Sequence, residues 1–95
     1  MIRYSPHMAQ VLLLLTPQPE RWFHGYEMAQ TLSMKSGTLY PLLIRLEGEG
    51  WLESRWDDST PRRHLYRLSD QGKMLAAGWL ERHPQRVQML KGVFT

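Results

Sequence analysis

The sequence predicts a small α+β domain that is mainly helical, with one β-hairpin between its third and fourth helices. Apolar residues repeat every three or four positions over most of the chain, as they do on the buried face of a helix. Between residues 51 and 68 the alternation changes to every second position, which is typical of paired strands. With 95 residues, 42% of them hydrophobic, the chain can bury one core, and it shows neither a repeat nor a second domain.

The first helix is expected to begin at Ser5-Pro6, because serine caps helices and proline is tolerated at the first helical position. Two prolines after residue 16 end it. Apolar residues surround this helix almost completely, so it packs either inside the domain or against a second subunit. Its main apolar repeat consists of Met8, Val11, Leu12 and Leu15.

After a connector at residues 21–25, a short helix is expected over residues 26–32. Only residues 33–35 separate it from a longer helix over residues 36–49, and two helices joined so tightly form a helix-turn-helix unit. One face of the longer helix is predicted to pack on the core. This face carries Leu39, Leu42, Leu43 and Leu46.

Pro41 lies inside the longer helix and needs an explanation. If Thr38 caps the helix, Pro41 takes the third helical position, where its N–H would be unpaired in any case. If Ser36 caps it, a kink or a tightened first turn is required. We expect an irregular start between residues 36 and 38.

The hairpin is expected to pair residues 51–56 with residues 62–68 across a polar turn. Leu52 and Trp56 share one face of the first strand, and His64, Tyr66 and Leu68 share one face of the second. Since two strands alone are marginally stable in water, the hairpin must pack against the helices as a wing.

A last helix is expected to begin at the cap Ser69 and to end near His83, because Pro84 follows. A second helical piece is expected after Pro84. We therefore divide the compact unit into residues 1–68 and a C-terminal helical segment, residues 69–95. The apolar side of this segment is expected to contact a second subunit.

Composition and motifs argue against several functional classes. The chain has no cysteine, which excludes disulfides and thiolate metal sites. Its four histidines lack metal-ligand spacing, and no phosphate-binding glycine loop or nucleophile motif is present. We therefore predict a protein that is not an enzyme and holds no cofactor or metal. No apolar run is long enough to span a membrane, and no export signal is visible, so a cytoplasmic location is expected.

The placement of basic residues favours a polyanionic partner. Residues 35–68 contain 6 basic and 5 acidic residues, so net charge does not decide the question. Cationic and hydroxyl groups lead the 36–49 helix, where a helix-turn-helix unit contacts base edges and phosphates, whereas the acids follow residue 46. The wing arginines suit a phosphate backbone or a minor groove, although two solvated arginines beside a turn would look the same. The candidate DNA-binding residues are Lys35, Ser36, Gly37, Thr38, Tyr40, Pro41, Arg45, Arg62, Arg63 and His64.

Several motifs, taken in order, resemble the PadR-like transcriptional regulators. The resemblance covers roughly residues 8–72, and its most specific part is the run GTLYPLL at residues 37–43. It implies a winged helix-turn-helix with three N-terminal helices, a two-stranded wing and a C-terminal helix. The other matching motifs are Gly25-Tyr26-Glu27, Arg45-Leu46-Glu47, Gly50-Trp51-Leu52, Arg62-Arg63, Tyr66-Arg67-Leu68-Ser69 and Gly72.

The resemblance also implies a homodimer that represses transcription from a palindromic operator, with the N-terminal and C-terminal helices at the dimer interface. Some members respond to small planar aromatic effectors, and Trp79 is a candidate contact, although such a tryptophan is more often a core or interface residue. Pro84 interrupts what is often one long dimerisation helix, and Leu65 stands where the family often has a tyrosine. The candidate dimerisation residues are Met8, Val11, Leu12, Leu15, Leu75, Trp79, Val87 and Leu90.

The leading hypothesis is a cytoplasmic, nucleoid-associated dimer that binds double-stranded DNA. Its two 36–49 helices would enter major grooves roughly 34 Å apart, with the 57–64 wing alongside. Two alternatives use the same fold without DNA, namely a protein-interaction module and a ligand sensor. The nearly balanced charge of residues 35–68 favours the interaction module over a DNA-binding protein.

Overall fold

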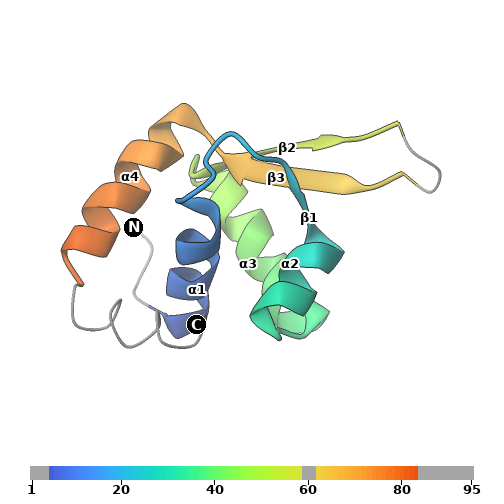
Figure 1. Ribbon diagram of the computed structural model, residues 1–95, viewed down its shortest axis with the longest axis horizontal. Coiled ribbons are helices and arrows are strands. Elements are labelled where there is room, and N and C mark those ends of the chain that lie inside the picture. Colours follow the sequence, from blue (N-terminus) through green and yellow to red (C-terminus); the bar gives the residue numbers. More distant parts are fainter. Residues whose placement is uncertain (1–4, 59–61, 84–95) are drawn as a thin grey trace.

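The structure, a computed structural model, describes residues 5–58 and 62–83. The elements in chain order are α1 (Pro6–Leu15), β1 (Phe23–His24), α2 (Gly25–Leu32), α3 (Ser36–Gly48), β2 (Leu52–Trp56), β3 (His64–Leu68) and α4 (Asp70–Glu81). Four helices and a projecting hairpin confirm the α+β winged-helix prediction (Figure 1). The expected helical piece after Pro84, with Val87 and Leu90, lies outside the described residues.

The sheet has three strands, one more than the sequence predicted. Its order is β1-β3-β2, with both neighbours of β3 antiparallel to it. The hairpin register runs from Leu52 opposite Leu68 to Trp56 opposite His64, so the two predicted strand faces coincide. β1 covers the other edge of β3 and has only two residues, too few to show a periodicity.

The caps of α1 and α4 are those that the sequence predicted. The Ser5 hydroxyl accepts the backbone N–H of Met8 at 3.0 Å, and the Ser69 hydroxyl accepts that of Gly72 at 2.8 Å. Each bond satisfies a helix N–H that has no partner within the helix.

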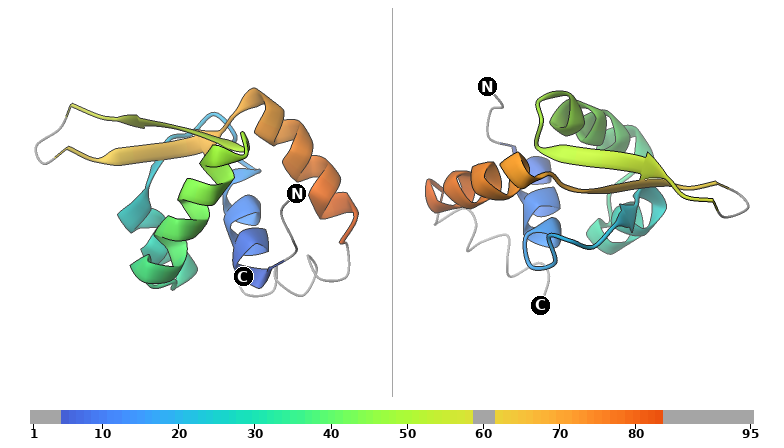
Figure 2. Two further views of the ribbon diagram at one scale, coloured as in Figure 1. Left: turned by 180° about the vertical axis from the view of Figure 1, so that it is seen from behind. Right: turned by 90° about the horizontal axis from the view of Figure 1, so that it is seen from above.

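The prediction that the α1 repeat contacts a second subunit is corrected by its burial within one chain. α1 lies between α4 and the α2–α3 pair (Figures 1 and 2), so its own chain covers it on several sides. The enclosed side chains, none more than 1% exposed, are those of Met8, Val11, Leu12 and Leu15. They form core, because a partner cannot reach atoms that the same chain already encloses.

α3 begins at Ser36, and its N-cap is Lys35, which makes no side-chain capping bond. The suggestion that Thr38 caps the helix is therefore wrong. The alternative that Ser36 caps the helix is wrong as well, because Ser36 is the first helical residue. The tightened first turn that it required is present, since the Lys35 carbonyl accepts the N–H groups of both Thr38 and Leu39 at 2.9 Å. Pro41 lies within the helix, where its ring leaves the Gly37 carbonyl without the usual donor, and exposed Gly37 leaves that carbonyl accessible to water.

The buried face of α3 joins the helices to the base of the wing. Leu39, Leu43 and Leu46 are fully buried, and Leu42 packs partly against the same core, as predicted. At the C-terminal end of this face, the backbone carbonyl of Trp51 accepts the N–H of Ser69 at 3.0 Å. The start of α4 is thereby tied to the start of β2. None of the described helices combines the length and the apolar character that a membrane span needs.

Candidate nucleic-acid interface

The front of α3 is open to solvent. The exposed predicted residues on it and before it are Lys35, Ser36, Gly37, Thr38, Pro41 and Arg45. Arg45 pairs with Glu49 one turn later, at 3.6 Å, so its charge is partly compensated. Around the missing side chain of Gly37 no other heavy atom lies within 4 Å. A ligand can therefore approach the first turns of this helix closely.

Aromatic rings organise the wing face that is turned toward α3. Trp56 stacks on His64 with 4.5 Å between ring centroids and 12° between ring planes, and His64 lies equally close to Tyr66. The Arg62 guanidinium lies 5.7 Å from the Trp56 ring. A hydrogen bond of 3.0 Å joins the Tyr66 hydroxyl to His64 Nδ1. These contacts form a continuous row from the wing arginine to the centre of the sheet.

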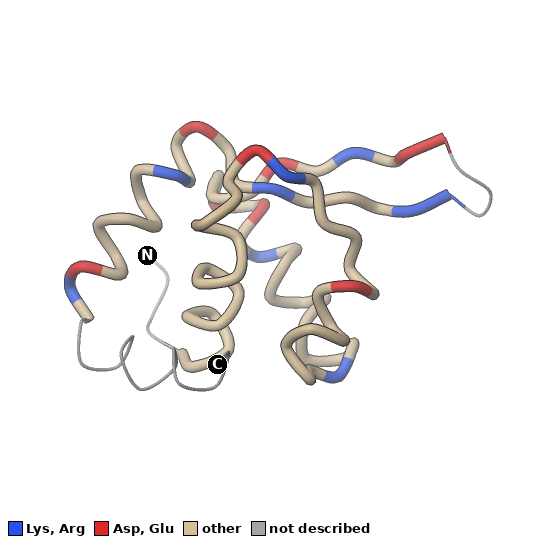
Figure 3. Tube along the Cα trace, viewed as in Figure 1, with Lys and Arg blue, Asp and Glu red and all other residues tan. Residues whose placement is uncertain are grey.

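Arg62 and Arg63 follow the wing turn, and both are exposed. Asp57 and Arg63 close the hairpin through two hydrogen bonds, one between backbone groups at 2.9 Å and one from Arg63 N–H to the Asp57 carboxylate at 3.1 Å. Among the described residues, neither guanidinium forms an ion pair with a carboxylate. Both charges are available to an anion (Figure 3).

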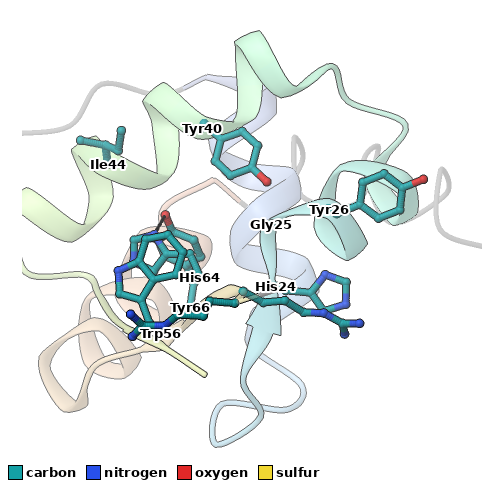
Figure 4. Close-up of a pocket in the computed structure, with 10 residues that line it drawn as sticks. His24, Gly25, Tyr26, Tyr40, Ile44, Trp56, His64 and Tyr66 are labelled. Carbon is teal, nitrogen blue, oxygen red and sulfur yellow. Dashed lines mark hydrogen bonds between the residues drawn. The ribbon is translucent and has the colours of Figure 1, made fainter. Parts of the chain in front are cut away.

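A pocket of about 440 Å³ lies between α3 and the wing. Tyr40 and Ile44 line the pocket from α3, with the Tyr40 hydroxyl pointing toward Gly25, and Trp56, His64 and Tyr66 line it from the wing (Figure 4). The structure thus brings four predicted residues to one pocket: Tyr40, Arg62, Arg63 and His64. Sequence reasoning did not select the other lining residues, which are His24, Gly25, Tyr26, Ile44, Trp56 and Tyr66. The sequence did contain a signal for Trp56, because its face of the first hairpin strand coincides with the face of the second strand that carries His64.

Gly25 lets Tyr40 lie over the start of α2. A Cβ atom at Gly25 would lie 2.5 Å from the Tyr40 hydroxyl, far inside van der Waals contact. The neighbouring cap is also unusual, because His24 Nδ1 accepts the N–H of Glu27 at 3.2 Å. The two helices of the helix-turn-helix unit, α2 and α3, therefore contact each other at the Tyr40 ring, which also lines the pocket.

The Tyr66 hydroxyl stays protonated to higher pH than a free phenol. Burial raises its pKa above the ordinary value, and the nearby Glu47 carboxylate and Tyr40 raise it further. Glu47 is itself held by a hydrogen bond from the Ser54 hydroxyl. A neutral phenol can keep its hydrogen bond to His64 across the physiological range.

Trp79 and Leu75, the other described residues predicted for dimerisation or effector binding, lie away from the α3–wing pocket. Trp79 is 3% exposed and belongs to the core, so its predicted role in the dimer interface is corrected for the same reason as that of the α1 residues. Its ring lies 4.6 Å from that of His83, and it is not among the residues that line the α3–wing pocket. Leu75 is half-buried against the core. Within the described ranges, no group of three or more His, Cys, Asp or Glu residues could hold a metal ion.

The chain is similar to a known protein family and to several solved structures. Residues 11–77 match the family described as the transcriptional regulator PadR-like family. A PadR-like transcription factor from Bacteroides fragilis is 25% identical, with a TM-score of 0.71 over 90% of this chain and 87% of its own. A PadR family regulator from Eggerthella lenta is 29% identical, with a TM-score of 0.65 over 92% of this chain and 80% of its own. No curated protein matches in sequence.

Proposed function

Because this chain belongs to the PadR-like family of transcriptional regulators, we propose that it binds duplex DNA as a dimeric repressor of a palindromic operator. One observation carries the DNA-binding part of this proposal. The open front of α3 and the two wing arginines flank the same pocket, so both can face one duplex. Winged-helix proteins use these two elements together, one in a groove and one beside it.

In this proposal α3 enters the major groove with its N-terminal turns leading. Ser36, Thr38 and Tyr40 offer hydroxyl groups to base edges or phosphates, and Lys35 and Arg45 add positive charge beside them. Arg62 and Arg63 contact the backbone or the minor groove next to the half-site. Two copies would place their α3 helices roughly 34 Å apart along the duplex.

The second copy is proposed to bind through the C-terminal segment, residues 69–95. Met74 on α4 is 78% exposed, so this helix offers an apolar side chain to a partner. Leu75 and the residues beyond Pro84 stay in the proposed interface. A small planar aromatic effector remains a prediction without an assigned site among the described residues.

The test of DNA binding is the salt dependence of affinity in the variant Arg63→Ala. Each phosphate contact contributes about 0.9 to the slope of log affinity against log salt concentration. The variant should bind all duplexes more weakly and lose about one unit of slope when anisotropy titrations are run at several salt concentrations. Arg82→Ala removes the same charge from an exposed site at the end of α4, the helix on the far side of the molecule from the wing (Figure 1). Because this site lies in the proposed dimer segment, the control is valid when sedimentation shows that the variant has kept the oligomeric state of the parent protein, and its slope should then be unchanged.

The same titration separates the alternatives. A protein-interaction module or a sensor without DNA function would show no salt-sensitive binding to random duplex DNA, even at low ionic strength. Selection of bound sequences from a random duplex pool then tests the dimer, because two symmetric half-sites one helical turn apart require two copies. Selected sequences without symmetry would contradict the dimeric part of the proposal.

A further inference from the structure

Ile44 is a large aliphatic side chain on the open face of α3. It is 64% exposed, unlike the leucines on the opposite face of the same helix, which are buried. It lines the pocket together with Tyr40 from α3 and Trp56 from the wing (Figure 4). Tyr26 and Trp56, which are 66% and 55% exposed, line the same pocket, so Ile44 belongs to a patch of exposed apolar side chains, and such a patch marks an interaction site.

Apart from the Tyr40 hydroxyl, the side chains beside Ile44 on this face offer no hydrogen-bonding groups. Gly37, Pro41 and Gly48 lie one to two helical turns from it and are exposed, and both glycines are open to close approach. Arg45 is the one side chain in the middle of α3 that could read guanine by paired hydrogen bonds, and the residues on the Ile44 face itself cannot read guanine or adenine in this way. Arg45, the next residue along the helix, pairs with Glu49 at 3.6 Å.

The charge of the surroundings favours a polyanionic occupant, which in the proposed function is duplex DNA. Arg62 and Arg63 line the same pocket, and among the described residues neither guanidinium forms an ion pair with a carboxylate, although the backbone N–H of Arg63 donates to Asp57. Phosphates held by these arginines would bring base edges toward α3. Of all groups that a base pair shows in the major groove, the C5 methyl of thymine is the apolar one.

We propose that Ile44 reads the 5-methyl group of a thymine, so that the protein selects T over C opposite the middle of α3. This inference rests on the proposed DNA-binding function. It adds a base preference that depends on shape and apolar contact instead of hydrogen bonding. Removal of one buried methyl contact should weaken binding roughly three- to five-fold.

The experiment replaces thymine by uracil, one position at a time, in a duplex selected from a random pool. Uracil lacks only the methyl group, so base pairing is unchanged. We expect a three- to five-fold loss of affinity at one position in each half-site for the parent protein. For Ile44→Ala the thymine and uracil duplexes should bind equally, and for Arg45→Ala both should weaken while their ratio is kept.

The outcomes distinguish failure of this inference from failure of the proposed function. Tight, salt-sensitive binding that is insensitive to uracil at every position would overturn the role of Ile44 and leave DNA binding intact. Discrimination that persists in Ile44→Ala would overturn it as well, because another residue would then read the methyl group. Absence of binding to any duplex would remove both proposals. Thermal unfolding of Ile44→Ala should match the parent protein, since the side chain is exposed.

Discussion

Gly72 is the position where the structure makes the sharpest prediction about stability. A Cβ atom there would lie 1.8 Å from the Trp51 carbonyl oxygen and 2.7 Å from its carbon, both backbone atoms. Ordinary contact needs about 3.4 Å, so α4 and the start of β2 would have to separate by roughly half the width of a methyl group or more. The hydrogen bond from Ser69 N–H to the Trp51 carbonyl would be strained or broken.

The expected cost of Gly72→Ala follows from three contributions. Overpacking costs about 1–3 kcal/mol, and loss of the Ser69 bond about 1 kcal/mol. The better helix propensity of alanine returns up to about 1 kcal/mol. With the full return from propensity the net loss is about 1–3 kcal/mol, which for a domain of this size lowers Tm by roughly 5–25 °C.

Gly78→Ala is the matched control on the same helix. The nearest atom to its added Cβ is the end of the Arg82 side chain at 3.5 Å, which is ordinary contact. This variant should therefore gain up to about 1 kcal/mol from helix propensity. Urea and thermal unfolding of both variants measure the difference directly. Equal shifts in the same direction, or an unchanged Tm for Gly72→Ala, would refute the close contact between α4 and Trp51.

Two further predictions concern the pocket. Gly25→Ala should displace the Tyr40 ring, because the added Cβ would lie 2.5 Å from its hydroxyl. The ring is the far end of a side chain, so stability should change by less than about 1 kcal/mol while DNA affinity falls; unchanged affinity would remove Tyr40 from the interface. The raised pKa of Tyr66 stabilises the fold fully below its unfolded value of 10.0, and this contribution is lost as pH rises through the folded value. The free energy of unfolding should thus fall above about pH 10, and that of the Tyr66→Phe variant should fall less steeply. Identical dependence on alkaline pH in the two proteins would contradict the raised pKa of Tyr66.

Much of the fold follows from local patterns. The leucine spacing of α3 predicts its buried face, and the serines before α1 and α4 predict their starts, because a cap needs only its own following residues. Alternation in the hairpin predicts which faces of β2 and β3 coincide. These features depend on neighbours within a few positions along the chain, so the amino-acid order alone determines them.

The tertiary structure decided what covers each face. The apolar repeat of α1 predicts burial equally well inside one chain or between two, and only the packing of α4 and α3 around it selects the first. β1 exists because the long edge of β3 pairs with two residues that carry no pattern of their own. Ile44 lies in α3 and Trp56 at the end of β2, so the end of the helix and nearly all of the first wing strand separate them along the chain. They line one pocket only because the sheet folds back over α3. Periodicity records that a side chain is buried or exposed, whereas its contacts depend on distant segments that folding brings together.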